Sequence, residues 1–396
     1  PAYRLVVITG PGGAGKTRLT IQAVRQIAAR AADLDAITFV PLAAAADRQT
    51  AVSTLAARLG VAHSGADDPL QEVVQHLRAQ RHLLVLDNLE QLADAAALVE
   101  AILQGAPQVQ ILATSREPLH LHGEQRLPVG GLPYPGDPTA PDAHKTPAVA
   151  LFVQSARQMS PGFRLDAEAA TAVVGLCRLV DGLPLGLELA AGWVRLMDCA
   201  AILREAEQNL GFLATNLADV PARHRSLHAI FHQTWTMLAP HLRDLLARAA
   251  LFPGDFSLAA LQGIAPAATM LDVATLLDKS LLRRNAANHY ELHPLLKQFV
   301  TAETDPPPAW RQQFSRFYLH SAAQRQADLH GRTPQQAMRQ MRRDQTNMRQ
   351  AWRWATDHAL WEEMAAALPA LSRFHQMAGL FAEVVTALSA ALAALP

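Results

Sequence analysis

The stretch LVVITGPGGAGKT, residues 5–17, decides the fold of the amino-terminal part. It joins an apolar run, Leu5–Thr9, to a segment that matches the pattern G-x-x-x-x-G-K-[ST], Gly10–Thr17. A buried strand, this loop and a following helix form the context in which backbone N–H groups surround a phosphate. The pattern therefore predicts a phosphate-binding loop, and a simple glycine-rich turn is the alternative interpretation.

Each residue type in this loop suits phosphate binding. Glycines let the backbone curl around an anion, and the positive end of the following helix faces the same anion. We expect Lys16 to reach the β- and γ-phosphates and Thr17 to ligate Mg²⁺. The Lys-Thr pair favours a nucleoside triphosphate over the dinucleotide that the overlapping G-x-G-x-x-G spacing would indicate. The residues expected to contact the nucleotide here are Gly10, Gly12, Gly13, Ala14, Gly15, Lys16, Thr17 and Arg18.

Further apolar runs follow this loop, at Ile37–Val40, Leu83–Leu86 and Ile111–Thr114. Segments with helical spacing lie between them, for example Leu70–Leu77. Short strands that alternate with helices are typical of a parallel sheet covered on both faces. The sequence therefore predicts an α/β P-loop NTPase domain over residues 1–127.

Two strand ends carry candidate catalytic residues. The run Leu83–Glu90 ends in Asp87, which we expect to hold Mg²⁺. Asn88 stands where many P-loop ATPases have a second acid, so Glu90 or Asn88 itself would orient the attacking water, and we expect slow hydrolysis. Arg116 would read the γ-phosphate through forked hydrogen bonds. The alternatives are a helix cap for Asp87, an exposed acid for Glu90 and a surface ion pair for Arg116.

Composition restricts the partners and the compartment. Lys plus Arg and Asp plus Glu each number 35, so no net field draws the chain to nucleic acid or to an anionic membrane. Cys177 and Cys199 are too few for a disulfide framework and suit a reducing, cytoplasmic compartment. The most apolar stretch, Met377–Leu395, has one-sided helical spacing, which argues against a membrane span. Because residue 1 is Pro, we expect a piece of a longer chain.

Breaks in the pattern divide the rest of the chain. The first break is the stretch Pro128–Pro147, which is rich in proline and glycine, and Asp305–Pro308 forms the second. The predicted parts are a linker at 128–147, a helical domain at 148–217, a smaller mixed domain at 218–303 and a helical arm at 304–396. Within the arm, Trp361–Leu395 has the pattern of two amphipathic helices joined near Gly379, like one tetratricopeptide-type (TPR-like) unit. Because one such unit cannot bury its apolar face, we expect more repeats beyond residue 396.

The order of these motifs resembles that of the STAND ATPases, which include the NB-ARC proteins and a branch of bacterial transcription regulators. The motifs that carry the resemblance are Gly10–Thr17, Leu83–Glu90, Thr114–Arg116 and Gly182–Leu185. Further on, Leu276–Leu282 and then Tyr290–Leu296 resemble the winged-helix domain of the bacterial branch. The likeness extends over about residues 3–300.

The resemblance implies a role for each matching residue. Pro184 would pack against the adenine, Arg116 would sense the γ-phosphate, and His293 would reach the β-phosphate of ADP from the winged helix. It also implies ATP or ADP with Mg²⁺, and a switch that is off with ADP and on with ATP. An unknown inducer on the carboxyl-terminal repeats would lead to self-association and to effector or transcriptional activation. By residue pattern alone, Pro184 could instead start a helix and His293 could lie at the edge of a core.

The sequence departs from the family pattern at two points. Asn88 replaces the second acid, which bears on the rate of hydrolysis. The Gly-Arg motif that contacts adenine in the family would lie before residue 1.

An alternative is an AAA+-like ATPase that acts on DNA through its winged helix. Charge argues against direct DNA contact, because basic and acidic residues nearly balance between Ser226 and Val300. The basic residues there are Arg243, Arg248, Lys279, Arg283, Arg284 and Lys297, and the acidic residues are Asp244, Asp255, Asp272, Asp278 and Glu291. The arginine-rich arm from Trp310 onward leaves nucleic acid open as a lesser alternative to a repeat scaffold. A scaffold with a degenerate nucleotide site is a third interpretation, against which the intact Gly10–Thr17 argues.

Overall fold

The computed structural model describes residues 3–30, 33–45, 47–61, 68–137, 142, 145–214, 226–331 and 334–394. The chain forms two compact units. The first comprises Pro1–Gln233 with Asp278–Ser280, and the second comprises Thr234–Leu277 with Leu281–Pro396. The chain passes between them inside helix α9, Leu227–Met237. The finer division predicted from the sequence, at residues 217/218 and 303/304, stays a prediction.

The first unit is built on a five-stranded parallel sheet with the order β2-β3-β4-β1-β5. The strands are β1 (Leu5–Thr9), β2 (Ala36–Pro41), β3 (His82–Asp87), β4 (Gln110–Ser115) and β5 (Glu124–Pro128). The four strands predicted from apolar runs are confirmed. The fifth, β5, lies at the edge beside β1, and its largely exposed residues form no apolar run. A strand of this kind pairs through its backbone, so its side chains carry no signal.

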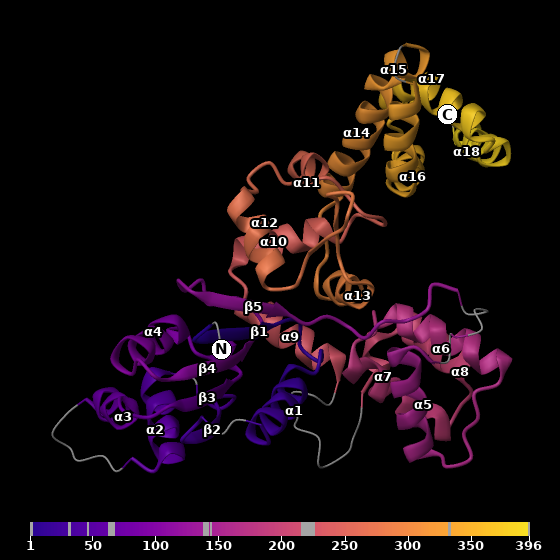
Figure 1. Ribbon diagram of the computed structural model, residues 1–396. Helices are drawn as coiled ribbons and strands as arrows, with labels where there is room; N and C mark the ends of the chain where they lie inside the picture. The colour runs from indigo at the N-terminus through magenta and orange to yellow at the C-terminus, as the bar shows by residue number, and fades with distance from the viewer. Residues whose placement is uncertain are drawn as a thin grey trace. The chain divides into compact units, whose positions relative to one another are not determined.

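The central strand β3 is buried along its whole length, on both faces of the sheet. Alternate strand residues, such as Leu84 with Leu86 and Ile111 with Ala113, join one buried cluster. The helices that complete this cluster are α2 (Arg48–Leu59), α3 (Pro69–Leu77) and α4 (Ala95–Gly105). Figure 1 shows these helices together on one side of the sheet, with α1 (Lys16–Ala28) on the other. The helix that follows the phosphate loop thus contributes no residue to this cluster.

A helical region completes the first unit. Its helices are α5 (Pro147–Met159), α6 (Ala167–Leu179), α7 (Pro184–Ala191) and α8 (Cys199–Gln208). Asp166 and Asp198 cap α6 and α8, each accepting a hydrogen bond from a backbone N–H three residues later. Gly182, in the turn before α7, has a φ of +66°, and a Cβ there would lie 2.0 Å from the Leu132 oxygen. The turn therefore fits tightly against the segment that leaves the sheet.

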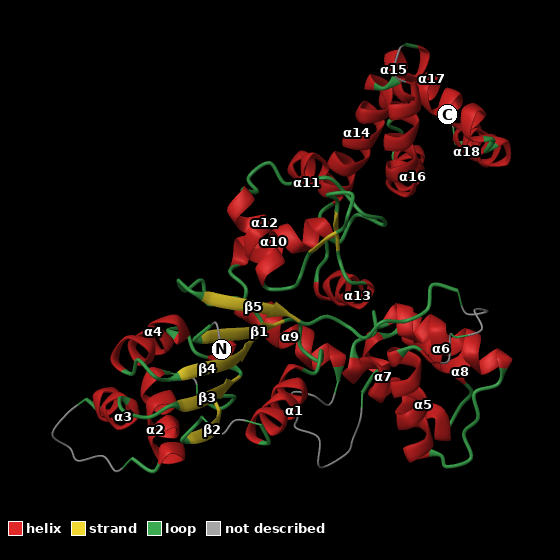
Figure 2. Ribbon diagram, in the orientation of Figure 1, coloured by secondary structure: helices red, strands yellow, loops and turns green. Residues whose placement is uncertain are grey.

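The second unit is helical in its described part except for a short hairpin, β6 (Arg283–Arg284) with β7 (Tyr290–Glu291), as Figure 2 shows. Its helices after α9 are α10 (Pro240–Ala249), α11 (Leu258–Ile264), α12 (Met270–Asp278), α13 (Pro294–Glu303), α14 (Pro308–Gln324), α15 (Gln326–His330), α16 (Pro334–Asp357), α17 (Trp361–Ala378) and α18 (Phe381–Ala393). Aromatic contacts of Phe252 with Phe256, Phe314 and Tyr318 form part of its core. The predicted winged helix and TPR-like arm stay predictions.

A buried asparagine ties the arm to the earlier part of this unit. Asn347 of α16 is fully buried and donates from Nδ2 to the Asp255 oxygen at 2.8 Å and the Tyr318 hydroxyl at 2.9 Å. Its Oδ1 accepts from the Gly254 N–H at 3.1 Å. Of the helices described, even the most apolar lacks the combined length and hydropathy of a bilayer-spanning segment.

Candidate functional site

The loop between β1 and α1 adopts the conformation that its glycines permit. Gly10, Gly13 and Gly15 have φ values of +152°, +81° and +85°. A Cβ on Gly10 would lie 2.1 Å from the Val129 oxygen. Glycine is therefore required at this position on two counts, backbone conformation and close approach.

Lys16 begins α1 and turns back over the loop. Its Nζ donates to the Gly10 oxygen at 2.8 Å and to the Pro11 oxygen at 3.1 Å. Burial lowers the pKa of Lys16 to about 8, while the nearby Glu90 carboxylate opposes the shift. A phosphate in the loop would supply the negative charge that this buried ammonium lacks.

An oxygen cluster lies beside Lys16. Thr17 Oγ1 and Thr114 Oγ1 both donate to Asp87 Oδ1, at 2.8 and 2.6 Å. Asp87 is buried at the end of β3, and it caps no helix. Hydroxyl and carboxylate oxygens are the ligands that Mg²⁺ prefers, so Thr17 and Asp87 fit the ion predicted for them. Within the described residues no cluster of three or more His, Cys, Asp or Glu side chains suits a metal.

Arg116 and Glu90 form a largely buried ion pair in the same site. Their Nε and Oε1 atoms lie 3.3 Å apart, and Asn88 Nδ2 donates to the same Oε1 at 3.4 Å. Arg116 also donates to Gln233 Oε1 at 2.8 Å. The second Glu90 oxygen, Oε2, is buried and accepts no hydrogen bond from the described residues. The interpretations of Glu90 as an exposed acid and of Arg116 as part of a surface ion pair are therefore wrong.

The helical region reaches the phosphate loop through the start of α7. The Leu185 N–H donates to the Gly13 oxygen at 3.3 Å. Pro184 Cγ lies 3.8 Å from the position of a Cβ on Gly15. Pro184 is thus both the first residue of α7 and a neighbour of the loop, so its two interpretations are compatible. Arg18 is exposed and forms an ion pair with Glu188 of α7 at 3.4 Å rather than with the loop.

His293 belongs to the second unit. It is buried at the start of α13, where its Nδ1 accepts a hydrogen bond from the Leu295 N–H at 3.1 Å. This contact gives the side chain a local structural role, the capping of a helix. Its contact with a nucleotide phosphate stays a prediction.

Two further residues belong to the site, although the sequence motifs assign neither of them a role in it. Thr114 bonds Asp87 from the neighbouring strand; a polar residue at the carboxyl end of a buried parallel strand is a usable signal for it. Gln233 bonds Arg116 from a position 117 residues further along the chain. No local pattern marks such a residue, because only the packing of α9 brings it to the site.

Comparison with known proteins supports the general nature of this site. Residues 2–117 match a family model described as an AAA domain. The Walker-type ATPase PABY2304 of Pyrococcus abyssi superposes with a TM-score of 0.52 at 12% identity, over 76% of this chain and 91% of that chain. Similarity at this level of identity shows the fold alone. The predicted α/β fold of a P-loop NTPase domain, followed by a helical region, is confirmed in this general form.

Relatives in mycobacteria extend the similarity along the chain. A Mycobacterium tuberculosis protein, "Putative HTH-type transcriptional regulator Rv0890c", is 35% identical over 286 residues, 70% of this chain and 31% of that protein. "Uncharacterized protein Rv0894" of the same species is 32% identical over 266 residues, 66% of this chain and 64% of that protein. The chain thus spans about a third of the first relative and less than two thirds of the second.

Proposed function

We propose that the chain binds ATP or ADP with Mg²⁺ at the loop Gly10–Thr17 and acts as a STAND-type switch, off with ADP and on with ATP. The contact between the start of α7 and the loop carries this proposal. Leu185 bonds Gly13 directly, and Pro184 lies against Gly15, so a nucleotide entering the loop meets the helical region at once. A change at the phosphates would therefore alter the contacts between the loop and the helical region.

Arg116 supplies a second route by which the phosphates influence the rest of the chain. It bonds Gln233, the last residue of the first unit before the chain enters the second. A γ-phosphate would compete with Glu90 and Gln233 for the guanidinium, because phosphate is a strong bidentate partner of arginine. The bond to α9 would then depend on whether ATP or ADP is present.

The chemistry assigned to the site is slow hydrolysis. Thr17 and Asp87 would hold Mg²⁺, which neutralises charge on the phosphates when bound. Glu90 carries the acceptor, Oε2, that can orient water, and Asn88 fixes its other oxygen. Without a γ-phosphate, Arg116 holds this carboxylate in an ion pair. Glu90 would then be released to orient water only when a γ-phosphate binds Arg116.

A single hydrogen bond contributes too little free energy to drive such a switch. Moving a switch from 1:99 to 99:1 takes about 5.5 kcal/mol of differential binding. A charged hydrogen bond from His293 to a phosphate contributes about 1.5–3 kcal/mol. Packing of the helical region, an inducer on the helical arm and self-association would have to supply the remainder. The name of the relative Rv0890c supports transcription as the process that the switch controls.

Two measurements test this function. Chromatography of the denatured, purified protein would identify any retained nucleotide, and we expect one ADP per chain. Light scattering in ADP and in a non-hydrolysable ATP analogue would then show whether ATP favours self-association. Steady hydrolysis stimulated by DNA, with the same mass in both nucleotides, would instead favour the AAA+-like alternative.

A further inference from the structure

The helical arm contains a cavity of about 630 Å³ between α16, α17 and α18. Sites for small molecules usually have volumes of about 300–1,000 Å³. All of its lining residues belong to the second unit, and none of them belongs to the candidate nucleotide site. The cavity is therefore a separate candidate binding site.

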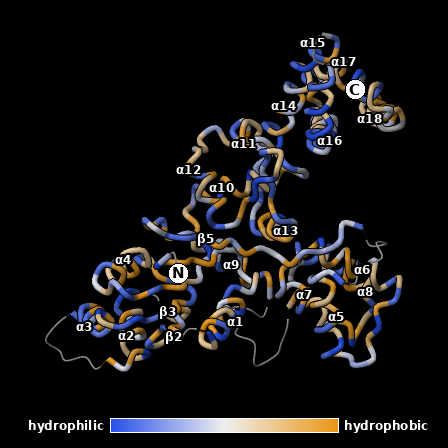
Figure 3. Tube along the Cα trace, viewed as in Figure 1, coloured by the Kyte–Doolittle hydropathy of each residue, from blue (hydrophilic) through white to orange (hydrophobic). Residues whose placement is uncertain are grey.

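Apolar side chains form most of the cavity wall. Leu371 and Phe374 come from α17, and Leu388 comes from α18. Figure 3 shows α18 as mainly hydrophobic. The Trp352 Nε1 donates to the Ala387 oxygen at 3.2 Å, so the polar edge of this ring is already satisfied. A ligand that fills this space needs an apolar body.

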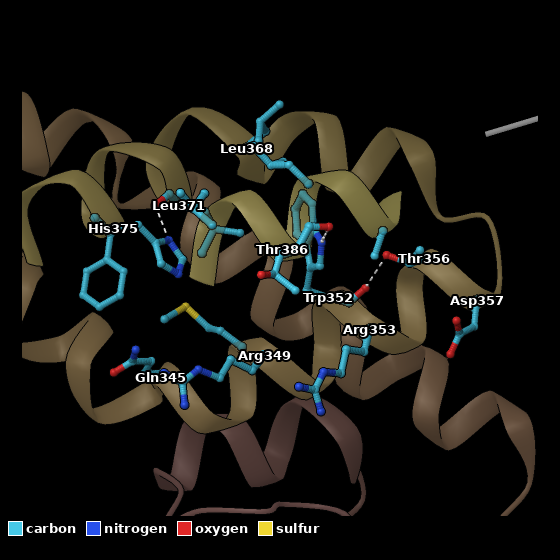
Figure 4. Close-up of a pocket in the computed structure, with 16 residues that line it drawn as sticks. Gln345, Arg349, Trp352, Arg353, Thr356, Asp357, Leu368, Leu371, His375 and Thr386 are labelled. Carbon is cyan, nitrogen blue, oxygen red and sulfur yellow. Dashed lines mark hydrogen bonds between the residues drawn. The ribbon is translucent and has the colours of Figure 1, made fainter. Parts of the chain in front are cut away.

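Polar groups gather on one wall. Gln345, Arg349 and Arg353 follow one another at intervals of four residues, which places them on one face of α16. Figure 4 shows them on the side opposite Leu371 and His375 of α17. Both arginines are exposed, whereas Trp352 is buried. A ligand would therefore keep its charged end near solvent and its apolar body inside.

The balance of charge limits the ligand further. Asp357 also lines the cavity, one turn after Arg353, so the described lining carries charges of both signs. The imidazole of His375 is engaged through Nδ1 with the Leu371 oxygen at 2.7 Å. The planar fork of each arginine matches a carboxylate. The Asp357 carboxylate disfavours a polyphosphate or nucleic acid, whose additional negative charges it would repel.

We propose that this cavity binds a monocarboxylic acid with an apolar body, such as a fatty or aromatic acid. The carboxylate would lie at Arg349 and Arg353, and the body would lie against Trp352, Leu371 and Phe374. The proposal goes beyond the nucleotide switch and does not depend on it. Failure of either one leaves the other standing.

Calorimetric titration of the whole chain tests the site with octanoate and 1-naphthaleneacetate as probes. We expect at least one of them to bind saturably, with one molecule per chain. For octanoate, 1-octanol is the neutral analogue and should bind about tenfold more weakly, because it lacks the charge that the arginines read. The double variant Arg349→Gln/Arg353→Gln should weaken binding of the acid by about tenfold or more.

Arg342→Gln is the matched control, since Arg342 is an exposed arginine of α16 outside the cavity and should leave binding unchanged. Equal affinity for octanoate and octanol would overturn the proposal and indicate an apolar groove for a peptide segment. Unchanged acid binding by the double variant would also overturn it. So would the absence of saturable binding for both acids at millimolar concentration.

Discussion

Arg116 and Glu90 pair inside the candidate site, with Nε and Oε1 3.3 Å apart and side chains 14% and 4% exposed. Burying an ion pair in this way costs free energy, because both charges lose most of their hydration. We infer that the pair holds Glu90 and Arg116 in position until the γ-phosphate of ATP displaces Glu90 from Arg116.

Replacing Glu90 with Gln tests this inference. The variant Glu90→Gln keeps the size of the side chain and removes its ability to accept a proton, and Arg116 retains Gln233 as an acceptor. We expect phosphate release from ATP to slow about 100-fold while ATP binding persists. Glu100→Gln, at an exposed acid of α4, is the control and should hydrolyse at the normal rate. Normal hydrolysis by Glu90→Gln would remove Glu90 from the catalytic step.

The lowered pKa of Lys16 predicts a pH dependence of nucleotide binding. Burial places this pKa at about 8 in the free protein, so the ammonium loses its proton as the pH rises above 8. Phosphate favours the protonated form, so affinity should fall above pH 8 by up to about tenfold per unit, with proton uptake on binding. Titrations in buffers of different ionisation enthalpy would measure this uptake. Constant affinity from pH 7 to 10 would contradict it.

The phosphate loop should be intolerant of a methyl group at Gly10. The variant Gly10→Ala places a Cβ against the Val129 backbone, and we expect it to lower the free energy of unfolding by about 2–4 kcal/mol. Gly60→Ala is the matched control: its φ of +71° is also positive, but nothing lies within 4 Å of its Cβ. It should cost about 1 kcal/mol. Urea denaturation measures both, and equal losses would show that the close approach at Gly10 is unimportant.

Variants at His293 separate capping from phosphate sensing. His293→Ala removes the acceptor for the Leu295 N–H, whereas His293→Asn can keep a capping oxygen. If the imidazole binds the β-phosphate, both variants should release a fluorescent ADP analogue about 10–100-fold faster in a stopped-flow chase. His241→Ala, at an exposed histidine of the same unit, should not. Normal release by His293→Asn would limit this residue to the helix cap.

The sequence carries strong signals for elements that are buried and regular. The apolar runs predict β1 to β4, and Gly10–Thr17 predicts the loop, because hydrophobic alternation and glycine spacing are local properties. The same holds for the break at Gly379, which ends α17 in the left-handed conformation.

Other features depend on packing between distant segments. Strand β5 is an exposed edge with polar side chains, so its pairing with β1 has no hydrophobic signature. The bond between Arg116 and Gln233 joins two segments 117 residues apart. Glutamate usually lies on the surface, and only the tertiary structure shows that Glu90 is largely buried. These contacts are visible in the structure and absent from any window of the sequence.

Binding of Mg-ADP, measured by calorimetric titration of the unmodified chain and of Lys16→Ala after removal of any retained nucleotide, tests the central claim most directly. Because Lys16 supplies the ammonium over the loop, we predict saturable binding of one nucleotide by the unmodified chain and none by the variant. Arg25→Ala, at an exposed cation of the same helix, should bind normally, and circular dichroism should show all three proteins folded. The same isotherm for Lys16→Ala and the unmodified chain would contradict a nucleotide site at this loop.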